Sequence, residues 1–184
     1  APYKGVLTHG FTLDEKGMKM SKSVGNTVAP DKVVKEYGAD ILRLWVAQSD
    51  YTVDLRIGPE ILKGTADSYR RLRNTLRFLL ANTADFDAKT QMLPPAEWLE
   101  TDRYALALTR KLQVQCTADY ERFEFHKVVQ ALMNFCSEDL GAFYLDILKD
   151  RLYTAAENAR ARRSAQVALW HVLQAVTRLM APVL

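Results

Sequence analysis

Apolar residues recur every three or four positions through the last two-thirds of this chain, and this periodicity constrains the fold more than any other feature. The pattern begins after Gly58-Pro59-Glu60 and continues, with short interruptions, to the carboxyl end. Such spacing places the apolar side chains on one face of each helix. Each helix then needs a partner for that face, and several helices joined by short loops favour an antiparallel bundle.

Four or more helices are expected between residues 58 and 184, the first ending near residue 84 and followed by a Pro-containing linker over residues 85–98. Gly141 is expected to permit close helix packing. Cys and aromatic residues in this pattern are expected to be core residues rather than parts of a metal or cofactor site. The positions predicted to face the core are Ile61, Thr65, Tyr69, Leu72, Leu76, Leu79, Tyr104, Leu108, Leu112, Cys116, Tyr120, Val128, Val129, Leu132, Met133, Cys136, Leu140, Phe143, Tyr144, Ile147, Leu148, Leu169, Trp170, Leu173, Val176 and Met180.

Residues 1–57 lack this long helical pattern and begin with a strand signal. Residues 6–13 are β-branched and apolar, residues 14–17 have turn composition, and residues 18–20 return to apolar character. This order predicts a β-hairpin with a glycine-containing loop.

Two short helices and an extended segment are expected next. Pro30 favours the first turn of a helix that ends near Tyr37, because Gly38 follows as a natural terminator. A second helix starting at Asp40 is apolar on nearly all sides, Val46 included, and is expected to be buried. Residues 51–57 alternate in polarity and predict a strand or extended link. Together these elements predict a small α+β unit.

The densest polar chemistry of the chain lies in the loop after the predicted hairpin. Lys19, Ser21, Lys22 and Ser23 fall within five residues, followed by Gly25-Asn26, which is expected to let the backbone take conformations that other residues avoid. Two mobile ammonium groups and two short hydroxyl donors suit a polyanion. The alternative is an ordinary solvated turn.

Arginine side chains gather along the first long helix. Arg70 and Arg77 share a face with Asn74, and Arg71 and Arg73 lie beside it. The guanidinium group is well shaped to contact RNA phosphates. The alternative is a solvated helix surface with internal ion pairs.

Composition is that of an ordinary soluble globular protein, with 48% apolar residues and a net charge of +3. Any nucleic-acid surface is therefore expected to be a local patch. No signal peptide or membrane-spanning apolar run is recognisable, which favours a cytoplasmic protein. A P-loop ATPase is excluded because no GxxxxGK[ST] string occurs. The apolar, uncapped carboxyl end and the start at Ala1-Pro2 predict a piece of a longer protein.

Several strings together resemble the class Ia aminoacyl-tRNA synthetases over the whole chain. Lys19-Met20-Ser21-Lys22-Ser23 matches the KMSKS signature of class I, with Val24-Gly25-Asn26 behind it. The lysine motif marks the class, and the later strings favour the isoleucine-specific members over the valine- and leucine-specific alternatives. These later strings are residues 38–47, 50–51, 54–57, 69–75, 78–80 and 139–146.

This resemblance implies an intact enzyme that activates isoleucine with ATP and Mg²⁺ and then transfers it to its tRNA. Lys22 corresponds to the second lysine of the motif and is expected to be the main catalytic contact to the departing pyrophosphate, with Lys19 second. Ser21 and Ser23 are expected to shape the ATP-binding loop or donate to the nucleotide.

The resemblance also divides the chain. Residues 1–57 would be the lysine-loop and stem-contact unit at the end of the catalytic region, and residues 58–184 a truncated helical domain that binds the tRNA anticodon. Arg70, Arg73 and Arg77 are candidate contacts to the tRNA backbone.

The other class I motif, His-x-Gly-His, does not occur, nor does a zinc-type Cys cluster or an inserted editing domain. The family places these elsewhere in the full chain. This piece is therefore expected to be inactive alone, to bind no zinc and to be monomeric. Two rival interpretations are a non-catalytic helical RNA-binding module with a relic loop, and a helical interaction protein whose lysine-rich turn is accidental.

Overall fold

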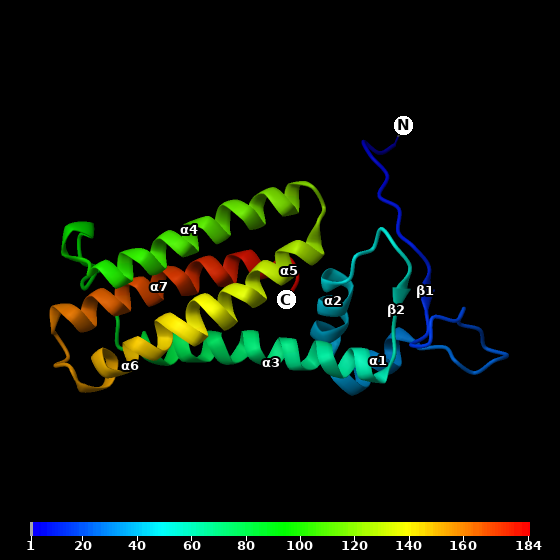
Figure 1. The fold of residues 1–184 in the computed structure, drawn as a ribbon, viewed down its shortest axis with the longest axis horizontal. Helices are drawn as coiled ribbons and strands as arrows, with labels where there is room; N and C mark the ends of the chain where they lie inside the picture. The colour runs from blue at the N-terminus through cyan, green and yellow to red at the C-terminus, as the bar shows by residue number, and fades with distance from the viewer. Residues whose placement is uncertain (1) are drawn as a thin grey trace.

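Four long helical runs lie along the long axis of the molecule, and a smaller unit is attached at one end (Figure 1). The structure, a computed structural model, describes residues 2–184. The elements in chain order are β1 (Thr12–Leu13), α1 (Pro30–Tyr37), α2 (Ala39–Gln48), β2 (Leu55–Arg56), α3 (Pro59–Asn82), the 3₁₀ turn η1 (Pro95–Glu97), α4 (Glu100–Glu121), α5 (Phe125–Asn134), the π-helix η2 (Phe135–Tyr144), α6 (Leu145–Thr154) and α7 (Arg160–Met180).

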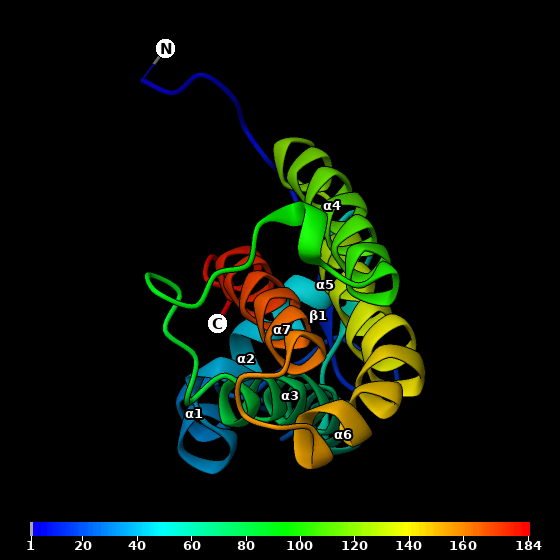
Figure 2. The ribbon, with the colours of Figure 1, turned by 90° about the vertical axis from the view of Figure 1, so that its left-hand side faces the viewer.

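The predicted helical bundle is confirmed, and its successive runs α3, α4, α5–η2–α6 and α7 alternate in direction (Figure 1). The long linker between α3 and α4 changes which helices become neighbours. Figure 2 shows this linker passing around the outside of α7. As a result α4 and α7 lie side by side in parallel: Leu99 N–H donates to Ser164 Oγ at their starts (2.8 Å), and Tyr120 Oη donates to Leu179 O at their ends (2.7 Å).

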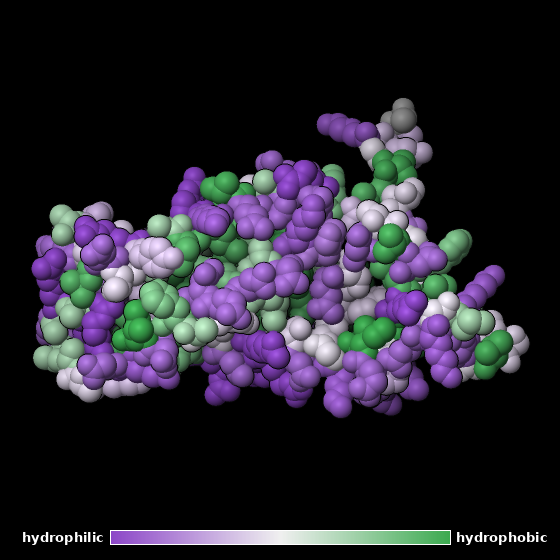
Figure 3. All heavy atoms as spheres, viewed as in Figure 1, coloured by the Kyte–Doolittle hydropathy of each residue, from purple (hydrophilic) through white to green (hydrophobic). Residues whose placement is uncertain are grey.

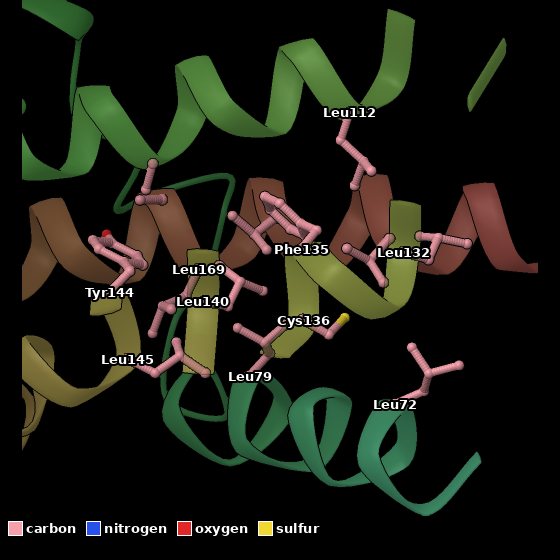
Figure 4. Packing of buried hydrophobic residues seen from close by; sticks show 14 of the residues in the cluster. Leu72, Leu79, Leu112, Leu132, Phe135, Cys136, Leu140, Tyr144, Leu145 and Leu169 are labelled. Atoms are coloured by element: carbon pink, nitrogen blue, oxygen red, sulfur yellow. The ribbon is translucent and has the colours of Figure 1, made fainter. Parts of the chain in front are cut away.

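Leucine and aromatic side chains from every run meet in one core (Figure 4). Leu72 and Leu79 enter it from α3 and Leu169 from α7, and all three are buried. Full burial of such a side chain contributes about 1.5–3 kcal/mol. The core therefore stabilises the bundle over its whole length.

Cys116 and Cys136 lie in this core as free thiols, as predicted. Burial raises the pKa of Cys116 to about 11 and that of Cys136 to about 12. Both thiols stay protonated at neutral pH and act as small apolar residues.

The smaller unit has its own apolar cluster, formed by Val33 of α1, Trp45 of α2, Ile57 and Leu62 in the first turn of α3. Trp45 Nε1 donates to the carbonyl of Arg56 at 3.1 Å, which satisfies the buried indole. The unit also packs against the bundle, because α2 contacts α5. The smaller unit is thus held against the bundle at two places, the start of α3 and α5.

The β-hairpin predicted for residues 6–20 is wrong in its strand pairing. β1 comprises only Thr12 and Leu13, and it pairs in parallel with β2, Thr12 opposite Leu55 and Leu13 opposite Arg56. Antiparallel pairing is limited to a single bridge between Leu13 and Lys19.

Both strand partners contribute to this difference. The N–H of Leu55 donates to Phe11 O at 2.7 Å and that of Ile57 to Leu13 O at 3.0 Å, so β2 satisfies one edge of β1. On the other side, Met20 packs against the small apolar cluster. Residues 18–20 therefore separate from β1 after the single pair of Leu13 and Lys19.

Four predicted core positions lie at the surface instead. Tyr104 and Phe143 are 53% and 43% exposed and contact each other edge to face, and Val46 of α2 and Ile147 of α6 are also exposed. The error at Tyr104 has a geometric cause. Each step of four residues rotates about 40° past a full turn, so a strict four-residue series drifts around the helix by about 160° over sixteen residues. The buried positions of α4 are Asp102, Ala105, Thr109, Leu112, Cys116 and Asp119.

Gly141 is exposed and does not mediate helix packing as predicted. It lies in η2, where the helix widens. A Cβ at this position would lie 3.0 Å from the carbonyl oxygen of Cys136, five residues earlier. The glycine therefore relieves crowding within the π-helical turn rather than between helices.

Candidate functional site

The loop that carries the lysines starts from a tight turn. Asp14 N–H donates to Met18 O, and Gly17 N–H donates to Asp14 O, each at 2.9 Å. Gly17 has a φ angle of 81°, which costs glycine little because it has no Cβ. The turn therefore delivers the following residues beside β1 in a defined direction.

The ammonium groups predicted to bind a polyanion are accessible. Lys19 and Lys22 are exposed, and within residues 2–184 no hydrogen bond or ion pair engages either side chain. Met20 between them is partly buried and packs against the small apolar cluster. The loop is thus anchored by its apolar residue while both cations face solvent.

The two serines shape the loop. Ser21 Oγ accepts a hydrogen bond from Val24 N–H at 3.2 Å and lies 3.1 Å from Ser23 Oγ. Gly25 closes the turn with a φ angle of 75°. Figure 3 shows this end of the molecule as a mixture of hydrophilic and hydrophobic side chains. Ser23 and Val24 are both exposed there, so the tip of the loop is open.

Asn26 ties the two ends of the loop together, a role that the sequence analysis missed. Its Oδ1 accepts from Ser21 N–H at 2.9 Å, and its Nδ2 donates to Asp14 Oδ2 at 2.9 Å and to Lys19 O at 3.2 Å. One amide therefore clasps the loop to the preceding turn. The only sequence signal is an Asn after the glycine, which also fits a simple turn.

Asp14 offers a direct test of this clasp. The hydrogen bond from Asn26, followed by that from Met18 N–H, holds the pKa of Asp14 below its ordinary value. A lowered folded pKa means that the contribution to stability is present above the unfolded pKa, about 3.9, and is lost as the pH falls through the folded value. Asn26→Ala should therefore raise the Asp14 midpoint, measured by NMR titration of its carboxyl carbon.

Asp87 provides the control for this titration. Its pKa is also lowered, by Lys89 N–H and the Thr90 hydroxyl, but it lies in the linker between α3 and α4. Its midpoint should stay in place in Asn26→Ala. An Asp14 midpoint that is the same in both proteins would contradict the clasp.

The three candidate arginines lie on one exposed face of α3. Arg70 forms an ion pair with Asp67 one turn earlier. Arg73 borders a recess of about 260 Å³ between α3 and the end of α7, otherwise lined largely by apolar residues. Arg77 has no ion pair within residues 2–184. Of the three, Arg70 has the internal ion pair weighed from the sequence, and all three are solvated in the described residues 2–184.

The structure does not bring the arginines to the lysine loop. The loop packs near the start of α3. Counted from Glu60 at 1.5 Å per residue, Arg70 and Arg77 lie about 15 Å and 26 Å further along that helix. The two charged features therefore suit different parts of a large ligand, or two ligands.

Neither metal clusters nor membrane spans are found in residues 2–184. No group of three or more His, Cys, Asp or Glu side chains is placed to hold a metal ion in this range. None of its helices is both long and apolar enough to cross a membrane.

Two family descriptions match the chain. Residues 1–58 match "tRNA synthetases class I (I, L, M and V)", and residues 102–184 match "Anticodon-binding domain of tRNA ligase". The first match contains the lysine loop, and the second contains α4 from its third residue onward together with α5 to α7.

Curated relatives match the whole chain. The isoleucine–tRNA ligases of Dechloromonas aromatica and Bordetella pertussis are 67% and 62% identical to it, each over 183 residues. These alignments cover 100% of this chain but 20% and 19% of the relatives, so the chain spans about one fifth of their length.

Two solved structures share the fold. One is an Agrobacterium radiobacter LeuRS in a ternary complex with tRNA and LeuAMS, with a TM-score of 0.72 and 23% identity over 95% of this chain and 20% of that one. The other is Mycobacterium tuberculosis methionyl-tRNA synthetase with methionyl-adenylate, with a TM-score of 0.75 and 21% identity over 95% of this chain and 35% of that one. At these identities the likeness concerns the fold alone.

Proposed function

We propose that this chain belongs to the class I tRNA synthetases and is part of an enzyme that joins isoleucine to its tRNA. The observation that carries the proposal is identity of 67% and 65% along the whole chain to isoleucine–tRNA ligases, lysine loop included. The exposed and unpaired lysines support it, because they are available to a ligand.

Residues 1–57 then form the end of the catalytic region. In the first reaction the carboxylate of isoleucine attacks the α-phosphorus of ATP, and pyrophosphate leaves. Lys22, with Lys19 second, would contact the departing phosphates, where negative charge grows as the bond breaks. Donors that bind this charge more tightly in the transition state than in the ground state lower the barrier.

The remaining loop residues would support this contact. Ser21 fixes the shape of the loop, and Ser23 offers a hydroxyl to the nucleotide. Mg²⁺ would enter with the phosphates of ATP and neutralise part of their charge; the ammonium groups of the lysine loop have no lone pair with which to ligate it.

Residues 58–184 would bind tRNA. The match of residues 102–184 to an anticodon-binding domain supports this assignment, and the exposed arginine face of α3 offers contacts to phosphates. We assign the intact protein to the cytoplasm as a monomer, with ATP, isoleucine and the isoleucine-accepting tRNA as its ligands.

The test is amino-acid-dependent exchange between ATP and pyrophosphate by the full-length protein. Isoleucine should support exchange with a kcat/KM roughly 10- to 200-fold above that for valine, the scale of one methylene in an apolar pocket. Leucine should support less than isoleucine. Exchange that favours valine or leucine would reject the isoleucine assignment, and no exchange with any amino acid would reject the enzyme.

Replacing Arg70, Arg73 and Arg77 together by Ala should weaken tRNA binding in a salt-dependent way. Each phosphate contact that is lost should reduce the slope of log K against log salt concentration by about 1. Binding isotherms of the full-length protein at several salt concentrations measure this slope. Arg71→Ala is the control, because Arg71 is also exposed but lies about 100° around α3 from Arg70. An unchanged slope in the triple variant would remove the arginines from the interface.

A further inference from the structure

The turn that carries the lysine loop is bound directly to the long bundle helix by one carboxylate. Glu15, the second residue of the turn, accepts hydrogen bonds at Oε1 from the backbone N–H of Glu60 at 3.0 Å and from that of Ile61 at 3.3 Å. These are the second and third residues of α3. The N–H groups in the first turn of a helix have no partner within the helix. The N-cap residue of α3 is Gly58, which has no side chain to accept hydrogen bonds from them. Glu15 therefore caps α3 from 45 positions earlier in the sequence.

Gly58 makes this approach possible. A Cβ at residue 58 would lie 2.6 Å from Glu15 Cβ and 2.7 Å from Glu15 Cδ, both far inside van der Waals contact. The backbone of Gly58 is extended, so the space, not the dihedral angles, demands glycine here. The fit between the turn and the helix start is thus close along the whole Glu15 side chain.

The contact completes a continuous path from α3 to the lysines. Glu15 is bonded to the helix, its neighbour Asp14 accepts from Asn26, and Asn26 in turn holds Ser21 N–H and Lys19 O. Every step is a hydrogen bond except the one from Glu15 to Asp14, which are neighbours joined by a peptide bond. The loop therefore has two supports, Met20 in the small cluster and this path to the helix.

We propose that Glu15 is a positioning residue for adenylate formation. By capping α3, it fixes the position of the lysine loop relative to the first turn of the helix that carries the arginine face. This inference rests on the proposed function, in which Lys22 contacts the departing pyrophosphate. Glu15 touches no reacting atom. It acts through the turn, so its loss should affect the transition state more than the binding of ATP.

Glu15→Ala in the full-length protein should lower kcat for isoleucine-dependent exchange by roughly 10- to 100-fold, the scale on which a shift of about 1 Å impairs catalysis. The KM for ATP and the Kd for tRNA should stay within about twofold. Glu15→Gln keeps an oxygen acceptor for both N–H groups and should restore kcat to within about threefold of the wild type.

A second variant makes the test independent of the carboxylate. Gly58→Ala keeps the glutamate at position 15, but the new methyl group would push its side chain away from the helix. This variant should produce a similar loss in kcat. Because both substitutions break the same contact, the double variant should be no slower than the slower single variant. Asp31→Ala is the control, since Asp31 is an exposed carboxylate of the same small unit and should leave kcat unchanged.

The outcomes separate this inference from the proposed function. A wild-type protein without isoleucine-dependent exchange would reject the function itself. An active wild type with a Glu15→Ala variant that melts at lower temperature but keeps its kcat would reduce Glu15 to a stabilising cap and overturn the inference. Multiplicative losses in the double variant would also overturn it. If Glu15→Ala does not fold, the comparison of Glu15→Gln with Gly58→Ala decides in the same way.

Discussion

Replacing Lys22 by alanine in the full-length protein should slow formation of the isoleucyl adenylate by roughly 10²–10³-fold, the scale of losing one preorganised donor to developing charge. The side chain is exposed and has no partner in residues 2–184, so its removal leaves no internal contact broken. Rapid-quench measurement of a single turnover, with saturating ATP and isoleucine, isolates the chemical step.

Two further lysine variants sharpen this prediction. Lys19→Ala should cost less than Lys22→Ala, because Lys22 is the main expected contact. Lys16→Ala removes an exposed ammonium group from the preceding turn and should leave the rate unchanged. A Lys22→Ala protein that loses only ATP affinity, with an unchanged rate at saturation, would show that Lys22 binds the ground state and the transition state equally.

The largest expected effect on stability comes from Asp102, which is fully buried at the start of α4. Its carboxylate accepts from Arg151 at 2.8 and 3.0 Å, from Tyr144 Oη at 2.7 Å and from Ser164 Oγ at 2.5 Å. It thereby joins α4 to η2, α6 and α7. Asp102→Ala should lower the free energy of unfolding by about 3–5 kcal/mol, because it leaves a largely buried guanidinium and two buried hydroxyls without their acceptor.

Urea unfolding of the 184-residue chain, followed by circular dichroism, measures this loss. Tyr144→Phe is the matched control: it removes one donor and keeps the ion pair with Arg151, so it should cost about 1–3 kcal/mol. Asp102→Asn, which keeps the shape and loses the charge, should lie between the two. If Asp102→Ala cost no more than Tyr144→Phe, the carboxylate would not be the centre of this network.

Local signals in the sequence predicted the helices well. Pro30 and Gly38 bound α1 as expected, and α3 runs from Pro59 to Asn82 against a predicted end near residue 84. Proline and glycine act on their own backbone, so their effect does not depend on distant residues. The π-helix η2 has no proline or glycine at either end, so no such marker sets its bounds.

Contacts between distant segments were beyond the sequence. Asp102 lies 42 residues from Tyr144 and 62 from Ser164, and no periodic pattern marks a carboxylate as the centre of a buried network. The pairing of β1 with β2, instead of with the predicted hairpin strand at residues 18–20, is also a contact between distant segments. Strand partners are chosen by the tertiary fold, whereas the hairpin rule considers only neighbouring residues.

Part of the candidate site could likewise be predicted from the sequence and part could not. The lysine loop is a contiguous string, so its chemistry was visible in the sequence. Asn26 was expected to give the backbone freedom, but Gly25 has the positive φ angle and Asn26 acts through its side chain. Glu15 was not distinguished from any other turn residue, because its partner helix begins more than forty residues later.

The most direct test of the account is a crystal structure of the full-length protein with ATP, Mg²⁺ and an isoleucine analogue that cannot react. We predict that Lys22 Nζ lies about 2.7–3.2 Å from an oxygen of the β- or γ-phosphate, within the range of a direct hydrogen bond. ATP bound with both Lys19 and Lys22 still directed into solvent, away from its phosphates, would contradict the role assigned to the loop.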